Sequence, residues 1–232
     1  MHNDNCYLII PASGSGSRMN AEIPKQYLKL ENGLTIVDQC LKTLLGIDQI
    51  SGCVIALAEG DERFKDSSYY KHPKILGFAL GGKERYHSVL SALNTLSEFA
   101  SSNDWVLVHD AVRPCIKKTD VENLIGEIFN HSIGGILATR AIDTIKKIKD
   151  KGEVSTIDRK KLYHAQTPQM FRFGILKEAI NNAIEINNHI TDESEAVEDL
   201  GHLIKIVTGS KSNIKITHSD DLKLANYFLN KP

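Results

Sequence analysis

CYLIIPASGSGSRM (residues 6–19) joins a continuous apolar run to a loop of glycine and serine. Continuous rather than alternating apolarity is typical of a strand that is covered on both faces, as in a parallel sheet. The small side chains of the loop let a ligand approach the backbone closely, and Arg18 and the nearby Lys25 of IPKQY add positive charge. The stretch therefore predicts a buried strand that ends at an anion-binding loop.

Two common phosphate-binding signatures do not fit this loop. The dinucleotide fingerprint G-x-G-x-x-G requires a third glycine where Met19 stands, and a P-loop requires Gly-Lys before Ser or Thr, where the chain has Ser17 and Arg18. A loop whose N–H groups face an anion, with two cations close by, favours a triphosphate as the ligand. A flexible surface loop with solvated charges is the alternative for the stretch taken alone.

Apolar runs alternate with helical patterns along the rest of the chain. We expect further strands at residues 52–58, 75–82, 105–110, 134–140 and 203–209, and helices at residues 35–47, 87–99, 119–129, 174–186 and 219–229. This alternation predicts a single domain over residues 1–232, with a Rossmann-like layered α/β/α sandwich and a mostly parallel sheet. Ligands of such sheets bind at the carboxyl ends of the strands.

Residues 138–158 break this rhythm. They are rich in β-forming residues with polar residues between them, and they turn at KDKGE, which predicts a protruding β-hairpin arm. An isolated hairpin is only marginally stable in water. We therefore expect the arm to pack against a second copy of the chain in a homodimer.

Composition excludes several classes of partner. The 28 Lys and Arg residues nearly balance 29 Asp and Glu residues, so the chain has no overall field that would attract nucleic acid or an anionic membrane. No signal pattern and no apolar run near the roughly 18 residues of a spanning helix are found. We expect a cytoplasmic protein whose four scattered cysteines are reduced core residues.

Five ordered motifs together resemble one enzyme family. They are PASGSGSRM with PKQYL, GGKERYHSV (81–89), VHDAVRPC (108–115), DRKKLYHAQTPQMF (158–171) and NIKIT (213–217). The first resembles the signature of nucleotidyltransferases with a glycosyltransferase-A-like fold. The whole set is similar to the 2-C-methyl-D-erythritol 4-phosphate cytidylyltransferase family. The resemblance implies transfer of CMP from CTP, accompanied by Mg²⁺, to methylerythritol phosphate with release of pyrophosphate.

The resemblance also implies a role for each matched residue. The implied catalytic residues are Arg18, Lys25, Arg159 and Lys215. The implied nucleotide-binding residues are Pro11, Ala12, Ser13, Gly14, Gly16, Gly82, Ser88, Asp110 and Ala111. The residues implied to bind the polyol phosphate are Arg113, Thr144, Arg159, Thr167 and Lys215. Thr144 would then reach the active site of the other subunit.

Asp110 follows the buried strand of WVLVHDAVRP. A carboxylate at the carboxyl end of a strand suits Mg²⁺ or a ribose hydroxyl, and the resemblance favours such a role, which makes Asp110 the candidate metal ligand. An aspartate that only caps the turn is the alternative. We interpret His109 as a packing or supporting residue. The acidic cluster of ITDESEAVE (190–198) is interpreted as the start of a helix rather than a metal site.

Two other functions compete with this interpretation. Ribitol 5-phosphate cytidylyltransferase is a relative with the same first loop and chemistry. A regulatory nucleotide-binding module without catalysis would be expected to lack Lys25 or Lys215, and both are present. The chain also departs from the family pattern: Lys83 stands where an acidic residue is common, and Arg140 and Ile142 stand where Pro and Arg are frequent.

Overall fold

The computed structural model of the protein describes residues 4–14, 23–150 and 152–230. A seven-stranded sheet has the order β3-β2-β1-β4-β8-β5-β9. Its strands are β1 (Cys6–Pro11), β2 (Ile50–Leu57), β3 (Ile75–Leu80), β4 (Trp105–Val108), β5 (Gly134–Arg140), β8 (Tyr163–Arg172) and β9 (Lys205–Thr208). β8 pairs antiparallel with both β4 and β5, and the other ladders are parallel. The mostly parallel sheet is therefore confirmed.

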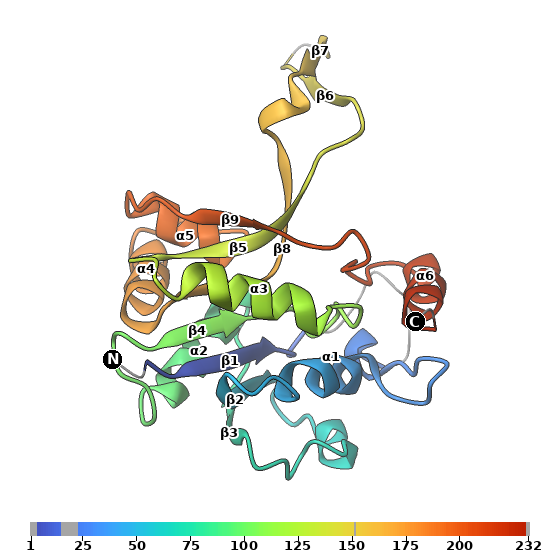
Figure 1. Ribbon diagram of the computed structural model, residues 1–232, viewed down its shortest axis with the longest axis vertical. Helices are drawn as coiled ribbons and strands as arrows, with labels where there is room; N and C mark the ends of the chain where they lie inside the picture. The colour runs from blue at the N-terminus through green and yellow to red at the C-terminus, as the bar shows by residue number, and fades with distance from the viewer. Residues whose placement is uncertain (1–3, 15–22, 151, 231–232) are drawn as a thin grey trace.

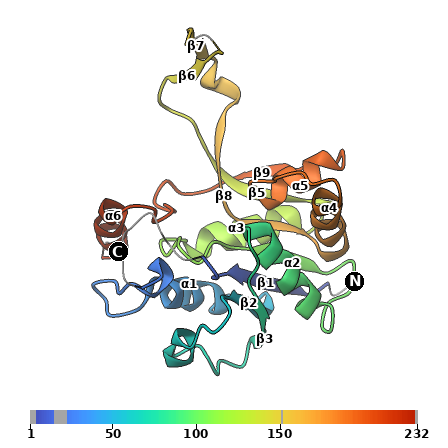
Figure 2. The ribbon, with the colours of Figure 1, turned by 180° about the vertical axis from the view of Figure 1, so that it is seen from behind.

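Helices cover both faces of this sheet. Successive side chains of β1 point to opposite faces, so Leu8 packs into one hydrophobic core and Ile9 into the other. Helices α1 (Ile36–Leu45) and α3 (Lys118–Ile128) cover the first core, and α2 (Arg85–Leu96), α4 (Phe173–Glu185) and α5 (Glu193–Asp199) cover the second. Figures 1 and 2 show these two layers from opposite sides. The predicted α/β/α sandwich is confirmed.

β8 is a strand that the sequence pattern did not predict. Its first half is mostly polar, and it contains Pro168. Pro168 lies just beyond the β4 ladder, whose last pair is Val108 and Gln169, and beside a register shift in the β5 ladder. A proline is tolerated there because the strand pairing is already interrupted. The reversed direction of β8 brings residues 163–167 to the edge where the other strands end.

The C-terminal segment packs beside the edge of the sheet at which the parallel strands end. Helix α6 (Ser219–Leu229) lies beside α1 in both views (Figures 1 and 2). Ile216 and Ala225 pack with Ile36 in a third hydrophobic cluster. The Ile216 N–H also donates to the carbonyl of Val112 at 2.9 Å. These contacts place Lys215 next to the turn that follows β4.

The predicted hairpin protrudes from the sandwich (Figure 1). Its strands β6 (Ile145–Ile148) and β7 (Val154–Ile157) form a separate antiparallel pair. Gly152 adopts φ +79° in the connecting turn, a left-handed conformation that favours glycine. Ile148 and Val154 face each other across the pair, and both side chains are exposed. The arm therefore carries apolar surface that the sandwich does not cover.

The four cysteines are buried, unpaired thiols, as predicted. Burial raises the pKa of the Cys6 thiol to about 12, so this side chain is neutral at physiological pH. Among the described residues, no helix has the length and apolarity that crossing a bilayer would require.

Candidate active site

A cavity of about 590 Å³ opens at the carboxyl ends of the central strands. Its lining includes the described residues that were implied for the nucleotide, namely Pro11, Ala12, Ser13, Gly14, Gly82, Ser88, Asp110 and Ala111. The implied catalytic residues Lys25 and Lys215 line it as well. Gln26, Arg85 and Val112 also line it, although sequence reasoning did not single them out. Gly16 and Arg18 lie outside the described residues. The described residues that were implied for the nucleotide thus line one cavity.

Ser88 connects the two loops of this cavity. Its side chain is almost fully buried, and its Oγ lies 2.8 Å from Ser13 Oγ and accepts the Gly82 N–H at 3.0 Å. A Cβ at Gly81 would come within 2.1 Å of Ser13 Cβ, so only glycine permits this approach. The hydroxyl of Ser88 therefore holds the first loop against the Gly81-Gly82 loop.

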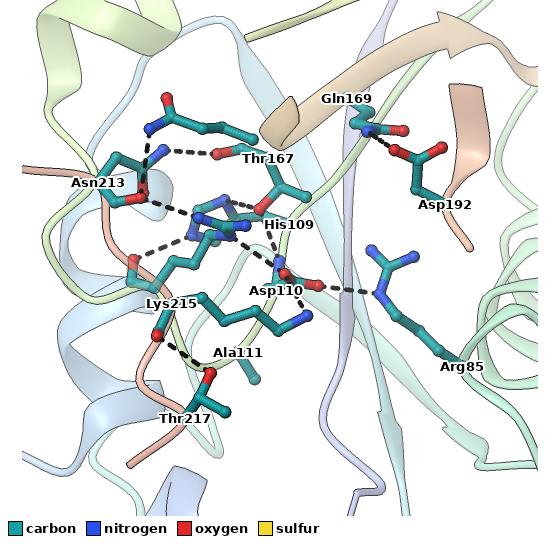
Figure 3. A network of polar contacts seen from close by, with 12 residues as sticks. Arg85, His109, Asp110, Ala111, Thr167, Gln169, Asp192, Asn213, Lys215 and Thr217 are labelled. Carbon is teal, nitrogen blue, oxygen red and sulfur yellow. Dashed lines mark hydrogen bonds and ion pairs between the residues drawn. The ribbon is translucent and has the colours of Figure 1, made fainter. Parts of the chain in front are cut away.

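Asp110 is the centre of a network of charges (Figure 3). Its Oδ1 accepts Arg85 Nε at 2.9 Å, and its Oδ2 accepts Arg113 Nε and Lys215 Nζ, both at 3.1 Å. Burial alone would raise the pKa of Asp110. The three cations outweigh burial and hold the pKa of the carboxyl well below its usual range. Asp110 is therefore an anion at any pH at which the protein would be assayed.

Arg85 extends this network to a second carboxylate. Its Nη1 donates to Glu193 Oε1 at 2.6 Å, and Glu193 is the first residue of α5. Burial raises the pKa of Glu193 in spite of Arg85, because this carboxylate has one cation where Asp110 has three. Asp192 caps α5 by accepting the Glu195 N–H, so the acidic cluster is a helix start as predicted.

Sequence reasoning missed Arg85 and Glu193. They are 108 residues apart, and each reads as a residue in the first turn of a helix. No local pattern links two such positions. Their pairing is visible only once α2 and α5 lie on the same face of the sheet.

His109 supports the network as a neutral ring. It is fully buried, and burial lowers its pKa to about 4. Thr167 Oγ1 accepts the Asp110 N–H at 3.1 Å and lies 3.1 Å from His109 Nδ1, while His109 Nε2 lies 3.2 Å from the carbonyl of Arg113. The carbonyl can only accept, so Nε2 carries the proton and Nδ1 accepts from Thr167. The structure thus agrees with a supporting role for His109.

A smaller cavity of about 150 Å³ adjoins the first. The two share Arg85, Asp110 and Lys215. The other residues of the smaller cavity are Arg113, Ala165, Gln166, Thr167, Gln169, Thr191 and Asp192. This mixture of hydroxyls and amides with cations at one side suits a polyol that carries a phosphate.

Thr144 and Arg159 lie on the arm rather than in these two cavities. They line a hollow with Thr156, Ile157 and Asp158, and both are exposed. Two of the departures from the family pattern are also on or near the arm. The Arg140 guanidinium lies 5.4 Å from the centre of the Tyr163 ring, and Ile142 is exposed. The third, Lys83, lines the larger cavity.

The fit of Mg²⁺ to this site depends on Asp110. Both oxygens of its carboxylate already accept hydrogen bonds from cations. Among the described residues, no group of three or more His, Cys, Asp or Glu side chains is arranged to hold a metal ion. Mg²⁺ often binds through one or two carboxylates together with substrate phosphates. The residues present therefore fit an ion whose ligands come mainly from a triphosphate.

Comparisons with known proteins agree with these motifs. The model of the family described as 2-C-methyl-D-erythritol 4-phosphate cytidylyltransferase matches residues 6–231. The relative of that name from Ruthia magnifica subsp. Calyptogena magnifica is 53% identical over 231 residues, covering 97% of each chain. The relative of the same name from Vibrio vulnificus strain YJ016 is 44% identical over 224 residues, covering 96% of this chain and 94% of its own.

A solved structure extends the similarity to the fold. The crystal structure of 2-C-methyl-D-erythritol 4-phosphate cytidylyltransferase from Francisella tularensis aligns with a TM-score of 0.83 at 39% identity. The alignment covers 97% of this chain and 99% of that one. The chain thus belongs to the 2-C-methyl-D-erythritol 4-phosphate cytidylyltransferase family.

Proposed function

We propose that the protein transfers CMP from CTP to 2-C-methyl-D-erythritol 4-phosphate, a step in the non-mevalonate synthesis of isoprenoid precursors in the cytoplasm. The observation that carries this proposal is the pair of adjoining cavities with a common wall of Arg85, Asp110 and Lys215. The larger cavity has the loop and lysine expected for CTP. The smaller has the hydroxyl and amide groups expected for a polyol phosphate.

In this reaction an oxygen of the substrate phosphate attacks the α-phosphorus of CTP. The bond from that phosphorus to the bridging oxygen breaks, and pyrophosphate leaves. Two anions must approach each other, and unit charges 4 Å apart interact by about 4 kcal/mol at an effective dielectric constant near 20. Lys25 at the triphosphate and Lys215 between the cavities offset this repulsion. We assign Arg18 to the triphosphate as well.

Mg²⁺ would accompany CTP, held mainly by the triphosphate with Asp110 as the candidate carboxylate ligand, and would supply further neutralisation of charge. If Asp110 does not bind the ion, its carboxylate would accept a hydrogen bond from a ribose hydroxyl of CTP. Lys215 and Arg113 both contact the Asp110 carboxylate in the structure. When the substrate phosphate enters, each of these two side chains can leave Asp110 and bind the phosphate instead. Arg85 keeps Asp110 in place during that exchange through its second contact with Glu193.

The arm supports the proposal that the protein works as a homodimer. It carries Thr144, Arg159 and the exposed apolar pair Ile148 and Val154 away from the sandwich. Its base, where Arg140 pairs with Tyr163, lies at the edge of the sheet that holds the cavities. An arm that crosses to a second copy would bring Thr144 and Arg159 to that copy's polyol phosphate.

Mixing two inactive variants tests this arrangement. We expect Lys25→Ala and Arg159→Ala homodimers to be nearly inactive. Refolded together, they should recover about a quarter of wild-type activity, because half of the dimers are mixed and each mixed dimer has one intact site. Lys160→Ala, an exposed neighbour on the same turn, is the matched control and should stay active. No recovery from two inactive variants would mean that the arm acts within its own subunit, and an active Arg159→Ala homodimer would mean that Arg159 has no role in the reaction.

The proposed reaction is tested by pyrophosphate release from CTP and Mg²⁺. We expect release with methylerythritol 4-phosphate and none without an acceptor. If pyrophosphate is released with ribitol 5-phosphate and not with methylerythritol 4-phosphate, the protein would instead be a ribitol 5-phosphate cytidylyltransferase. Binding of CTP without release from either acceptor would favour the non-catalytic module.

A further inference from the structure

We propose that Gln26 is a positioning residue for the nucleotide, whose side-chain amide turns the carbonyls of the first loop away from the triphosphate. Gln26 Nε2 donates to the carbonyl of Ala12 at 2.7 Å and to the carbonyl of Gly14 at 3.1 Å. The inference deepens the proposed function and rests on it, because it concerns the same CTP site.

The two contacts use the full donor capacity of the Gln26 side chain. A glutamine amide has two N–H groups on one nitrogen, and here each has a loop carbonyl within reach. Gln26 is 3% exposed, so water does not compete for these hydrogen bonds. A hydrogen bond is stronger in a buried, poorly solvated environment, so these two bonds hold the loop carbonyls in a defined orientation.

Fixing these carbonyls has an electrostatic effect on an anion. A carbonyl oxygen is the negative end of the peptide dipole and repels a phosphate. Across a trans peptide the C=O and the N–H point in opposite directions, so the Ala12 carbonyl fixes the direction of the Ser13 N–H. Ala12, Ser13 and Gly14 all line the larger cavity. The loop is thereby pre-set for an anion before one binds.

Gln26 also joins this loop to Lys25. Both residues belong to the short 3₁₀ helix η2 (Lys25–Tyr27), and Lys25 lines the cavity. Tyr27 anchors the other end of this turn, since its ring is buried in the first core and its hydroxyl donates to Asp61 at 2.7 Å. The amide of Gln26 therefore sets the position of the lysine relative to the loop.

Gln26→Glu tests this role because it keeps the shape of the side chain and removes both donors. The carboxylate then faces two carbonyls and adds a negative charge beside the triphosphate. We expect the KM and the Kd for CTP to rise by on the order of 10²-fold, the scale of leaving two buried acceptors without donors. The KM for methylerythritol phosphate should change by less than about 2-fold, because Gln26 does not line the smaller cavity.

The pH dependence of this variant gives a readout that a purely structural role would not give. Burial and the two carbonyls should raise the pKa of the introduced carboxyl, and its protonated form again offers one O–H donor. The Kd for CTP, measured where urea unfolding shows the variant to be folded, should therefore fall toward the wild-type value as the pH falls from about 8 to about 6. The free energy of unfolding should rise over the same range, because the raised pKa favours the neutral carboxyl in the folded state, so the stability curve is the control for this readout. Gln26→Met, without donor or charge, should bind CTP weakly with no such recovery.

Gln39→Glu is the matched control. Gln39 is also buried, but its Oε1 accepts from Asn32 Nδ2 at 2.9 Å, and a carboxylate keeps that bond. This variant should bind CTP as the wild type does. Wild-type CTP affinity in Gln26→Glu, or equal losses for both substrates without recovery at lower pH, would overturn the inference. An inactive wild type would contradict the proposed function instead, and the CTP titrations would still decide the role of Gln26.

Discussion

Alanine in place of Lys25 is expected to reduce the kcat of pyrophosphate release by about 10²- to 10³-fold, the usual scale for one preorganised electrostatic contact. Lys25 lines the larger cavity beside the loop of Ala12 to Gly14. Its ammonium would face charge that grows on the leaving pyrophosphate, so its loss acts on the transition state more than on substrate binding. Lys25→Arg keeps the charge on a wider group and should recover part of the rate.

The measurement is steady-state kinetics of Lys25→Ala with CTP and methylerythritol phosphate, together with thermal unfolding. Lys29→Ala is the matched control, because Lys29 is an exposed lysine four residues further on. We expect similar unfolding temperatures for the wild type and both variants, since Lys25 is partly exposed and contributes little to the core. A kcat for Lys25→Ala within a few-fold of the wild type would remove this lysine from the mechanism.

The second large effect is expected for Asp110→Asn, which should lose about 3–5 kcal/mol of unfolding free energy together with activity. The substitution removes the charge that pairs with Arg85, Arg113 and Lys215. Arg85 and Arg113 are largely buried, so the cations are left without their carboxylate in a poorly solvated place. Asparagine keeps the shape, but only its Oδ1 can accept, and its NH2 group faces the donors on the other side.

This loss should depend on pH with a defined sign. The pKa of Asp110 is lowered in the folded protein, so its stabilisation is complete above the unfolded pKa of about 4 and declines as the pH falls below it. Urea unfolding should therefore separate wild type from Asp110→Asn most at pH 7 and progressively less below about pH 4. Asp48→Asn, at an exposed position, should match the wild type throughout. A constant difference at all pH values would mean that charge is not the cause.

Most of the fold could be predicted because the central strands carry a strong local signal. Leu8 and Ile9 are adjacent and both fully buried, which requires cover on two faces and appears in the sequence as an unbroken apolar run. β8 lacks this signal, because residues 165–167 line the smaller cavity and Pro168 lies where the strand pairing is irregular. Its position between β4 and β5 depends on contacts distant in sequence, which periodicity does not record.

Candidate site residues could be predicted where they belong to a local sequence motif. They could not be predicted where only the tertiary fold brings them together. Asp110 follows a buried strand, a position that indicates function without further knowledge. Arg85 and Glu193 each look like ordinary residues at a helix start, and only tertiary packing brings them together. Gln26 stands beside the predicted Lys25, but its role depends on the direction of two backbone carbonyls, which the sequence does not encode locally.

The reversed direction of β8 also determines where this fold can take up an insertion. Any insertion between β5 and β8 extends outward from the edge that holds the two cavities, and the ladder that ends at Arg140 and Tyr163 separates it from the sandwich. Residues there can therefore change in length and composition without disturbing either hydrophobic layer. Under the proposed dimer, in which the arm meets both the partner subunit and the acceptor, one insertion could change assembly and acceptor preference together while the stability of the domain stays the same.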